Sequence, residues 1–177
     1  MNRDAPFASF DDRVDRLVEP IRNVHAAVLV FMVASAVGDF GLLWHAIGLI
    51  RAIGSVDRFR DALVFSSMIG IESLLLNQGI KRFFRRTRPT ERGDDRISVR
   101  TPSTSSFPSG HASSAFFSAL VLTYWVTWPW MVLFYLIAII IAISRIGARI
   151  HHASDVLAGA ITGTLLGVIG LVVLSKL

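Results

Sequence analysis

Residues 112–143 read ASSAFFSALVLTYWVTWPWMVLFYLIAIIIAI and contain no charged residue. The stretch holds two apolar runs, and each approaches the length of about 20 residues that a helix needs to cross the hydrocarbon core of a membrane. Trp128-Pro129-Trp130 separates the runs and predicts a turn, and Trp and Tyr near it are typical of a membrane interface. The stretch therefore predicts a membrane hairpin whose two outer ends lie on the same side of the membrane.

Two further apolar stretches flank this hairpin and are long enough to span a membrane. Residues 61–80 carry Glu72 as the only charge in their interior, and residues 156–174 carry no charge. With the hairpin they predict four spans. The second stretch also has small residues at about four-residue spacing, which let helices approach closely in lipid: Gly159, Gly163, Gly167 and Gly170.

The N-terminal part holds a longer apolar run, residues 24–50, which is interrupted at 38–41 by two glycines and an aspartate. A continuous helix over this run would be about 40 Å long at 1.5 Å per residue. Either a membrane-embedded helix over 24–37 precedes a span over 40–54, or both segments are spans. The sequence therefore predicts five or six spans in total.

Residues 10–22 carry apolar side chains at helical spacing among charges, which predicts an amphipathic helix lying flat on the membrane surface. We therefore expect an all-α integral membrane protein, a bundle of five or six transmembrane helices with an interfacial N-terminal helix. In this interpretation residues 1–23 form the interfacial segment and residues 24–177 form a single transmembrane domain. The apolar side chains of the first segment are Phe10, Val14, Leu17, Val18 and Ile21.

Composition agrees with a membrane protein that has an anionic partner. The 177 residues are 53% apolar and 18% charged, with a net charge of +5, and the mean hydropathy is +0.55. The absence of Cys excludes a disulfide scaffold, a thiol nucleophile and Cys-ligated metal sites. Ten of the 18 Lys and Arg residues lie within 81–100 and 145–149. Because this basic region is wedged between spans and has few aromatic residues, nucleic acid is the least favoured partner.

Three polar clusters are predicted to converge on one side of the membrane. Residues 81–89 follow one span, and residues 108–111 precede the next after a polar loop, so these two clusters share a side. The hairpin then crosses the membrane and returns, which brings residues 144–155 back to that side. Segments far apart in the sequence should therefore form one site.

The clusters contain residues that suit a phosphate group. Lys81, Arg88 and Arg145 supply permanent positive charge, and the guanidinium group matches phosphate oxygens in bidentate geometry. Ser109 and Gly110 stand just before a predicted helix, where backbone amides and the helix dipole can hold an anion. The sequence therefore predicts a phosphate-binding site.

The same clusters contain groups that can transfer a phosphoryl group. His111 and His151 are the side chains among them that change charge near neutral pH. Asp155 lies four residues after His151, one helical turn on, so its carboxylate can accept a hydrogen bond from one ring nitrogen and leave the other free to attack. Together with the cations, these groups predict phosphoryl transfer without a metal ion.

These residues resemble the three-part signature of the type 2 phosphatidic acid phosphatase (PAP2) superfamily, in its small bacterial membrane branch. The parts read K-x6-R-P over 81–89, P-S-G-H over 108–111 and S-R-x5-H-x3-D over 144–155, and the resemblance covers about residues 40–175. It implies a phosphatase that needs neither metal nor cofactor. In such a phosphatase His151 would be the nucleophile, His111 the general acid and Asp155 the group that orients His151. The resemblance assigns phosphate binding to Lys81, Arg88, Ser109, Gly110 and Arg145.

The expected reaction is hydrolysis of the phosphomonoester or diphosphate of a membrane lipid through a phosphohistidine. Polyprenyl phosphates or diphosphates, decaprenyl-phosphoryl sugar phosphates, phosphatidylglycerophosphate and phosphatidic acid are all candidate substrates, and the sequence does not choose among them. The alternatives are a lipid phosphotransferase and a non-catalytic protein that binds or transports lipid phosphates. The expected partners are the lipid substrate and the bilayer, with the oligomeric state left open.

The expected location is the plasma membrane of a bacterial-type cell, with the side of the site left open. If residues 24–37 do not span, the positive-inside rule favours a cytoplasmic site, but phosphate binding explains several of the same charges. Glu72 and Asp39 are ionisable residues at or near membrane depth. We interpret both as structural pairing residues, and His152 is of interest as the neighbour of His151. The remaining basic residues either mark topology and attract headgroups or, with equal weight, contact substrate: Arg82, Arg85, Arg86, Arg92, Arg96 and Arg100.

Overall fold

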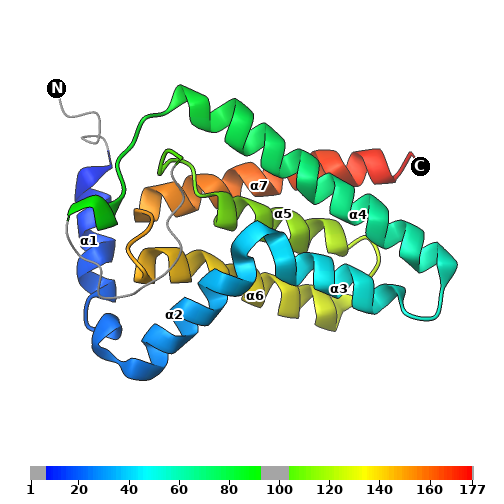
Figure 1. The fold of residues 1–177 in the computed structure, drawn as a ribbon, viewed down its shortest axis with the longest axis horizontal. Coiled ribbons are helices and arrows are strands. Elements are labelled where there is room, and N and C mark those ends of the chain that lie inside the picture. The colour runs from blue at the N-terminus through cyan, green and yellow to red at the C-terminus, as the bar shows by residue number, and fades with distance from the viewer. Residues whose placement is uncertain (1–6, 93–103, 177) are drawn as a thin grey trace.

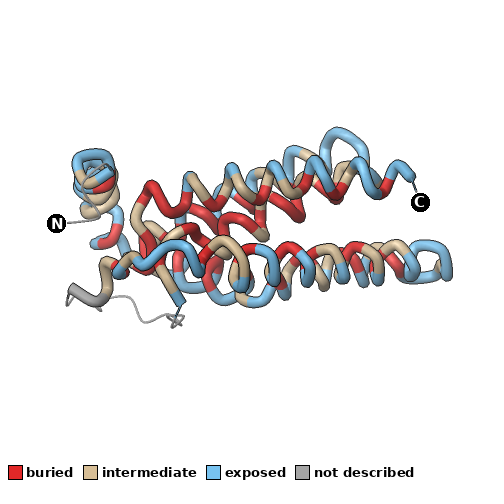
Figure 2. The backbone as a smooth tube through the Cα atoms, turned by 90° about the horizontal axis from the view of Figure 1, so that it is seen from above, coloured by how far each residue is buried: buried red, intermediate tan, exposed pale blue. Residues whose placement is uncertain are grey.

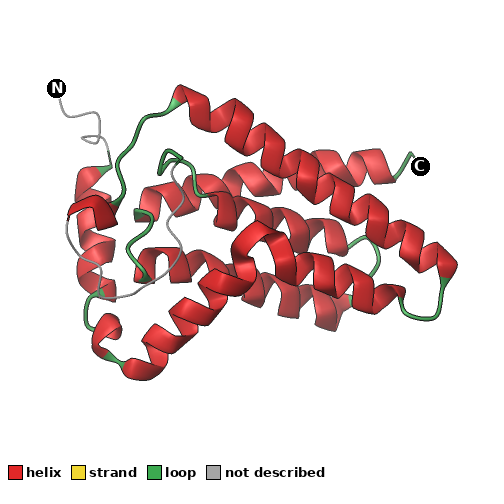
Figure 3. Cartoon of the chain, viewed as in Figure 1, coloured by secondary structure: helices red, strands yellow, loops and turns green. Residues whose placement is uncertain are grey.

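The computed structural model describes residues 7–92 and 104–176, so Arg96 and Arg100 lie outside the described residues. Within these two ranges the secondary structure is entirely helical, with short connecting loops (Figure 3). The longer helices are α1 (Ala8–Val18), α2 (His25–Gly38), α3 (Leu42–Ala52), α4 (Val56–Leu74), α5 (Gly110–Leu122), α6 (Trp128–Gly147) and α7 (Ala153–Leu174). Short turns of 3-10 or π helix occupy Ile21–Asn23, Asp39–Gly41, Leu75–Gly79, Ile80–Phe83 and Pro89–Arg92.

Helix α5 is the central helix of the bundle. It packs against α4, α6 and α7, and eight of its 13 residues are buried, from Ala112 to Leu122. Thirteen residues make a helix about 20 Å long, which is shorter than the roughly 30 Å hydrocarbon core. The predicted span over 112–128 is therefore too long at its C-terminal end, because α5 stops at Leu122. Its neighbours shield it from lipid, as the concentration of buried positions inside the bundle shows (Figure 2).

The turn of the hairpin lies before the Trp128-Pro129-Trp130 sequence, so the predicted position was wrong. Helix α6 begins at Trp128 and carries the proline in its first turn. Proline fits there because the first amides of a helix have no acceptor within the helix and its fixed φ suits helical geometry. The hairpin itself is confirmed, since α5 and α6 lie side by side (Figure 1).

Helices α2 and α3 together make one passage along the bundle. They follow one another in the same general direction, with a break at Asp39–Gly41 (Figure 1). The combined stretch His25–Ala52 is long and apolar enough to cross a membrane, as are Val56–Phe83, Trp128–Gly147 and Ala153–Leu174. With the shorter α5 this makes five passages within the described part of the chain, and the start of α2 lies at the same end as the polar clusters (Figure 1). A separate membrane span over 24–37 alone was therefore the wrong alternative.

The outer faces of α6 and α7 are apolar, as a helix in contact with lipid requires. Both helices expose a row of aliphatic side chains on the side away from α5. Without water, only an apolar face and internally bonded backbone are compatible with the hydrocarbon region. The exposed rows are Val132, Leu133, Leu136, Ile139, Ile140 and Ile143 on α6, and Leu157, Ile161, Leu165, Val168, Ile169 and Val172 on α7.

Helix α1 lies across the end of the bundle that holds the polar clusters (Figure 1). It turns Asp11 inward, where the carboxylate is buried, and leaves Phe10 and Leu17 exposed. Arg22, just after α1, donates to the backbone carbonyls of Gly147 at 2.9 Å and Ile146 at 3.0 Å. A cation at the last carbonyls of a helix is favourable, so this contact fastens the N-terminal segment to the end of α6. The division of the chain at residue 24 stays a prediction.

Close packing of α5 against α7 depends on the small residues of α7. A Cβ added at Gly163 would overlap the backbone carbonyl of Ser113 in α5, whereas one added at Gly70 in α4 would meet nothing within 4 Å. The predicted role of the glycine series in close helix approach therefore holds at Gly163.

Gly163→Ala is expected to destabilise the protein by about 1–3 kcal/mol, because backbone must move to admit the methyl group. Gly70→Ala is the matched control and is expected to be neutral or to stabilise by up to about 1 kcal/mol, because alanine is the better helix former. Thermal unfolding in detergent measures both. Equal midpoints for the two variants would contradict the packing argument.

Candidate active site

The three polar clusters meet at one end of the bundle, as predicted. Lys81, Gly110, His111 and His151 line one cavity of about 570 Å³. Arg88, Ser109 and Asp155 contact this group or one another, as described below, and the backbone carbonyl of Arg145 accepts from the amide of His151 at 3.2 Å. The predicted site residues that are buried are Lys81, Arg88, Ser109, Arg145, His151 and Asp155, while Gly110 and His111 are half-buried.

Arg88 joins the first cluster to the third. Its guanidinium donates to the backbone carbonyls of Ile150 at 3.0 Å and Thr104 at 3.0 Å. The same Nη1 lies 3.2 Å from Nε2 of His151. Because a guanidinium has only donors, Nε2 must be the acceptor in this contact and therefore carries the lone pair. A cation suited to a phosphate oxygen thus lies beside an unprotonated imidazole nitrogen.

Asp155 lies on the opposite edge of the His151 ring. Its Oδ2 is 3.6 Å from Nδ1 of His151, and Ser106 bridges the two, with its hydroxyl donating to Oδ2 at 2.6 Å and lying 3.4 Å from Nδ1. Asp155 lies beside His151 as predicted, but at 3.6 Å Ser106 links the two in place of the predicted direct hydrogen bond. The helical spacing given as the reason for their proximity is also wrong. Helix α7 begins at Ala153, so His151 precedes the helix, and Asp155 accepts from the backbone amide of His152 at 2.9 Å as part of the helix cap.

Two contacts place the other phosphate-binding candidates. The backbone amide of Ser109 donates to the carbonyl of Asp155 at 2.9 Å, and its side chain caps α5. This bond ties the start of α5 to the start of α7. Arg145, fully buried near the end of α6, makes a short hydrogen bond from Nη1 to Oγ of Ser35 in α2. The N-terminal half of the chain therefore helps to hold the cationic site.

Arg86 holds the other oxygen of Asp155. Its Nη1 donates to Oδ1 of Asp155 at 2.5 Å and to Oγ of Ser154 at 2.7 Å, while its Nη2 donates to Oδ2 of Asp11 in α1 at 2.7 Å. Asp11 also accepts from the backbone amide of Ser154 at 2.8 Å. In the sequence Arg86 stands among the general basic residues, and nothing there distinguishes Asp11 or Ser106. A buried carboxylate needs such partners, but their positions follow only from the fold.

Arg86→Gln is expected to lower kcat on the order of 10²-fold, since small displacements of groups that position a nucleophile carry losses of that size. The amide cannot supply a charge to Asp155, so the carboxylate would hold His151 less firmly. Phosphate release from a lipid phosphate in detergent measures the loss. Arg58→Gln, an exposed position whose side chain bonds the backbone at Ile53, is the matched control, and an equal loss there would contradict this role.

Burial keeps the His151 imidazole neutral. Desolvation, helped by the charges of Arg88 and Arg145 and opposed by Asp155, lowers the pKa of His151 from 6.5 to about 3. A neutral ring is the form that can attack phosphorus. At neutral pH the free protein therefore holds His151 in the neutral form that a nucleophile requires.

The lowered pKa of His151 also predicts how stability changes with pH. Between about pH 6.5 and pH 3 the unfolded chain binds a proton at this histidine that the folded protein does not. Stability is therefore lost as pH falls through this window, on the order of 1 kcal/mol per pH unit at most. We expect the melting temperature of the wild type to drop further than that of His151→Gln between pH 7 and pH 4.5. A constant difference between the two would contradict a buried neutral His151.

His111 and Asp39 form a second imidazole–carboxylate pair. His111 lies in the first turn of α5, and its Nε2 is 2.9 Å from Oδ1 of Asp39, at the break between α2 and α3.

Glu72, the other ionisable residue singled out in the sequence, is buried between α4 and α5 and accepts a short hydrogen bond from Ser113. His152 caps α7 and places Nδ1 3.3 Å from Oδ2 of Asp155.

The cavity that both histidines line has charged groups and exposed apolar side chains in its wall. Besides His111, His151 and Lys81, the wall includes Phe40 and Leu74, which are 71% and 62% exposed. A molecule with a polar group and an apolar tail would match this mixed lining. Within 7–92 and 104–176 no group of three or more His, Asp or Glu side chains is placed to hold a metal ion.

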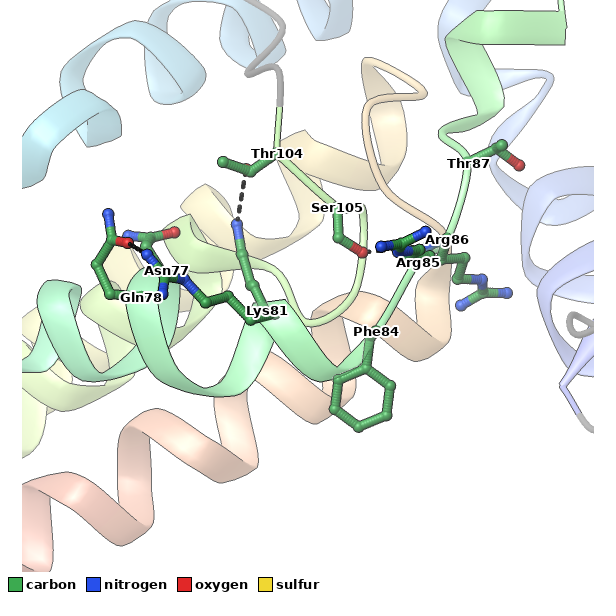
Figure 4. A pocket seen from close by; sticks show the side chains of 10 residues that line it. Asn77, Gln78, Lys81, Phe84, Arg85, Arg86, Thr87, Thr104 and Ser105 are labelled. Atoms are coloured by element: carbon green, nitrogen blue, oxygen red, sulfur yellow. Dashed lines mark hydrogen bonds between the residues drawn. The ribbon is translucent and has the colours of Figure 1, made fainter.

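A second cavity, also of about 570 Å³, adjoins the first (Figure 4). The two share Lys81, whose Nζ lies 3.4 Å from Oγ1 of Thr104. Several cations surround this second cavity, so it can attract an anionic headgroup toward the site. It is lined by Asn77, Gln78, Lys81, Arg82, Phe84, Arg85, Arg86, Thr87, Thr104 and Ser105.

The fold and the site are those of a membrane phosphatase, and the chain belongs to the PAP2 superfamily, whose family model matches residues 61–177. A decaprenylphosphoryl-5-phosphoribose phosphatase from Mycobacterium tuberculosis is 33% identical over 132 residues, which are 75% of this chain and 72% of that protein. The predicted family is confirmed, as is the predicted class of enzyme, a membrane lipid phosphatase that hydrolyses phosphoester bonds.

Two solved structures share the fold. The crystal structure of a transmembrane PAP2-type phosphatidylglycerolphosphate phosphatase from Bacillus subtilis has a TM-score of 0.78 and 24% identity, covering 98% of this chain and 88% of that one. The crystal structure of Aquifex aeolicus LpxE has a TM-score of 0.72 and 26% identity, covering 90% and 93%. The predicted all-α integral membrane architecture is thereby confirmed.

Proposed function

We propose that the protein hydrolyses a lipid phosphate in two steps without a metal ion. In the first step Nε2 of His151 attacks phosphorus, the bond from phosphorus to the leaving oxygen breaks, and His111 donates a proton to that oxygen. In the second step water, deprotonated by His111, attacks the phosphohistidine and restores Nε2. The 3.2 Å contact between Arg88 and Nε2 of His151 carries this proposal, because it joins a phosphate-binding cation to the lone pair of the nucleophile.

The remaining cations of the site bind the phosphate in this proposal. Lys81 and Arg145 balance its charge together with Arg88, and the amide of Gly110 and the hydroxyl of Ser109 supply donors at the start of α5. Gly110 stands close to the ammonium of Lys81, since a Cβ at this glycine would lie 3.6 Å from Nζ. Such donors stabilise the charge that accumulates on the phosphoryl oxygens as the reaction proceeds.

Among lipid phosphates, we propose a polyprenyl-linked sugar phosphate in the plasma membrane of a bacterial-type cell. The relative from Mycobacterium tuberculosis carries a name of this class. The lining of the cavity also includes His45, Asn77 and Ser114, whose polar groups suit the hydroxyl groups of a sugar. The apolar rim suits a prenyl chain that stays in the bilayer.

The wild type is expected to release phosphate from lipid phosphates in detergent with no added acceptor and in the presence of EDTA, fastest from a polyprenyl-linked sugar phosphate. His151→Ala is expected to lose turnover because it removes the imidazole that attacks phosphorus in this mechanism. A panel with phosphatidic acid, phosphatidylglycerophosphate and polyprenyl diphosphate measures the preference.

His25→Ala is the matched control, because His25 is an exposed histidine at the start of α2, and it should keep wild-type rates. Wild-type rates in His151→Ala, or a strict requirement for added Mg²⁺, would contradict the mechanism. Release that appears only when an acceptor alcohol is added would favour the phosphotransferase instead.

A further inference from the structure

Asp39 reaches the candidate general acid from a different part of the chain. It lies in the break between α2 and α3, outside the three motifs, and its Oδ1 is 2.9 Å from Nε2 of His111. Both side chains are largely shielded from solvent, with exposures of 18% for Asp39 and 12% for His111. In such surroundings a charge-assisted hydrogen bond is stronger than at the surface.

The backbone around Asp39 is shaped to fit against His111. The residues that follow, Phe40 and Gly41, have φ of +54° and +69°, and a phenylalanine in the left-handed region costs free energy that the surrounding structure must offset. On the other side, a Cβ at Gly38 would lie 3.0 Å from Cδ2 of His111. The break in the helix therefore brings backbone and a carboxylate against one edge of this imidazole.

We propose that Asp39 is a positioning residue that fixes the orientation and the tautomer of His111, an inference that rests on the proposed function. With Nε2–H bound to Asp39, Nδ1 is left to serve the leaving oxygen. In the first step the Nδ1 proton passes to that oxygen, and the carboxylate stabilises the protonated ring that this step requires. The ring is then neutral, with its proton on Nε2 and a lone pair on Nδ1, so it can take a proton from water in the second step.

This role predicts a dependence on the leaving group. An alkyl phosphate needs protonation of its leaving oxygen, whereas p-nitrophenyl phosphate releases a phenolate that is stable without a proton. The parameter kcat/KM reports only the steps up to departure of the leaving group, so the hydrolysis of the phosphoenzyme does not enter it. Loss of Asp39 should therefore affect kcat/KM for the alkyl ester alone, and a merely structural role would affect both esters.

The test compares Asp39→Asn with the wild type on a lipid alkyl phosphate and on p-nitrophenyl phosphate in the same detergent. We expect kcat/KM to fall on the order of 10²-fold or more for the alkyl ester, the usual size of general acid catalysis, and less than about tenfold for the aryl ester. Asp61→Asn is the matched control, because Asp61 is a half-buried carboxylate in α4 that pairs with Arg51, and it should change neither value.

A double variant, His111→Gln with Asp39→Asn, keeps the test decisive if Asp39→Asn alone impairs folding. In His111→Gln the acid is already absent, so adding Asp39→Asn should lower kcat/KM for the alkyl ester no further. Equal losses on both esters, no loss on the alkyl ester, or a further loss in the double variant would overturn the positioning role while leaving lipid phosphate hydrolysis intact. A wild type that cleaves neither ester would overturn the proposed function itself and the inference with it.

Discussion

The buried carboxylate of Asp155 is the point to which the separate parts of the molecule are tied. It receives hydrogen bonds from Ser106 in the loop before α5, from the amide of His152 and from Arg86 in the first motif. Because a buried carboxylate is costly without such partners, the three segments that supply them are held in one arrangement. Through Arg86 the same network reaches Asp11, so that α1 becomes part of the site and is more than a surface helix.

The buried cationic groups need a negatively charged partner, just as the buried carboxylate of Asp155 needs donors. Lys81, Arg88 and Arg145 are buried within one site, and their mutual repulsion favours any state in which an anion lies among them. The phosphate of the proposed lipid substrate would supply that anion beside His151. Each histidine has a carboxylate on one edge of its ring, Asp155 beside His151 and Asp39 beside His111, and Asp39 lies outside the three motifs.

The sequence was sufficient to predict the membrane hairpin and the convergence of the three motifs, because hydropathy sets which ends of the spans share a side. It could not predict partners that depend on three-dimensional proximity. Nothing in the pattern separates Arg86 from Arg85, and only the path of the loop brings Ser106 between His151 and Asp155. The start of α7 at Ala153 was missed for a related reason, since a four-residue spacing fits a helix and a helix cap equally well. The turn was misplaced because proline also suits the first turn of a helix.

The shortness of α5 has a consequence for access to the site. A helix of about 20 Å cannot reach both surfaces of a hydrocarbon layer of roughly 30 Å, so at least one of its ends lies below the level of the headgroups. Should this be the end that carries His111, the phosphate must be drawn down beneath its own headgroup plane before it reacts. The depth of the site would then select substrates. A lipid phosphate can enter such a recess from the bilayer, whereas a phosphate on a large water-soluble protein cannot reach it.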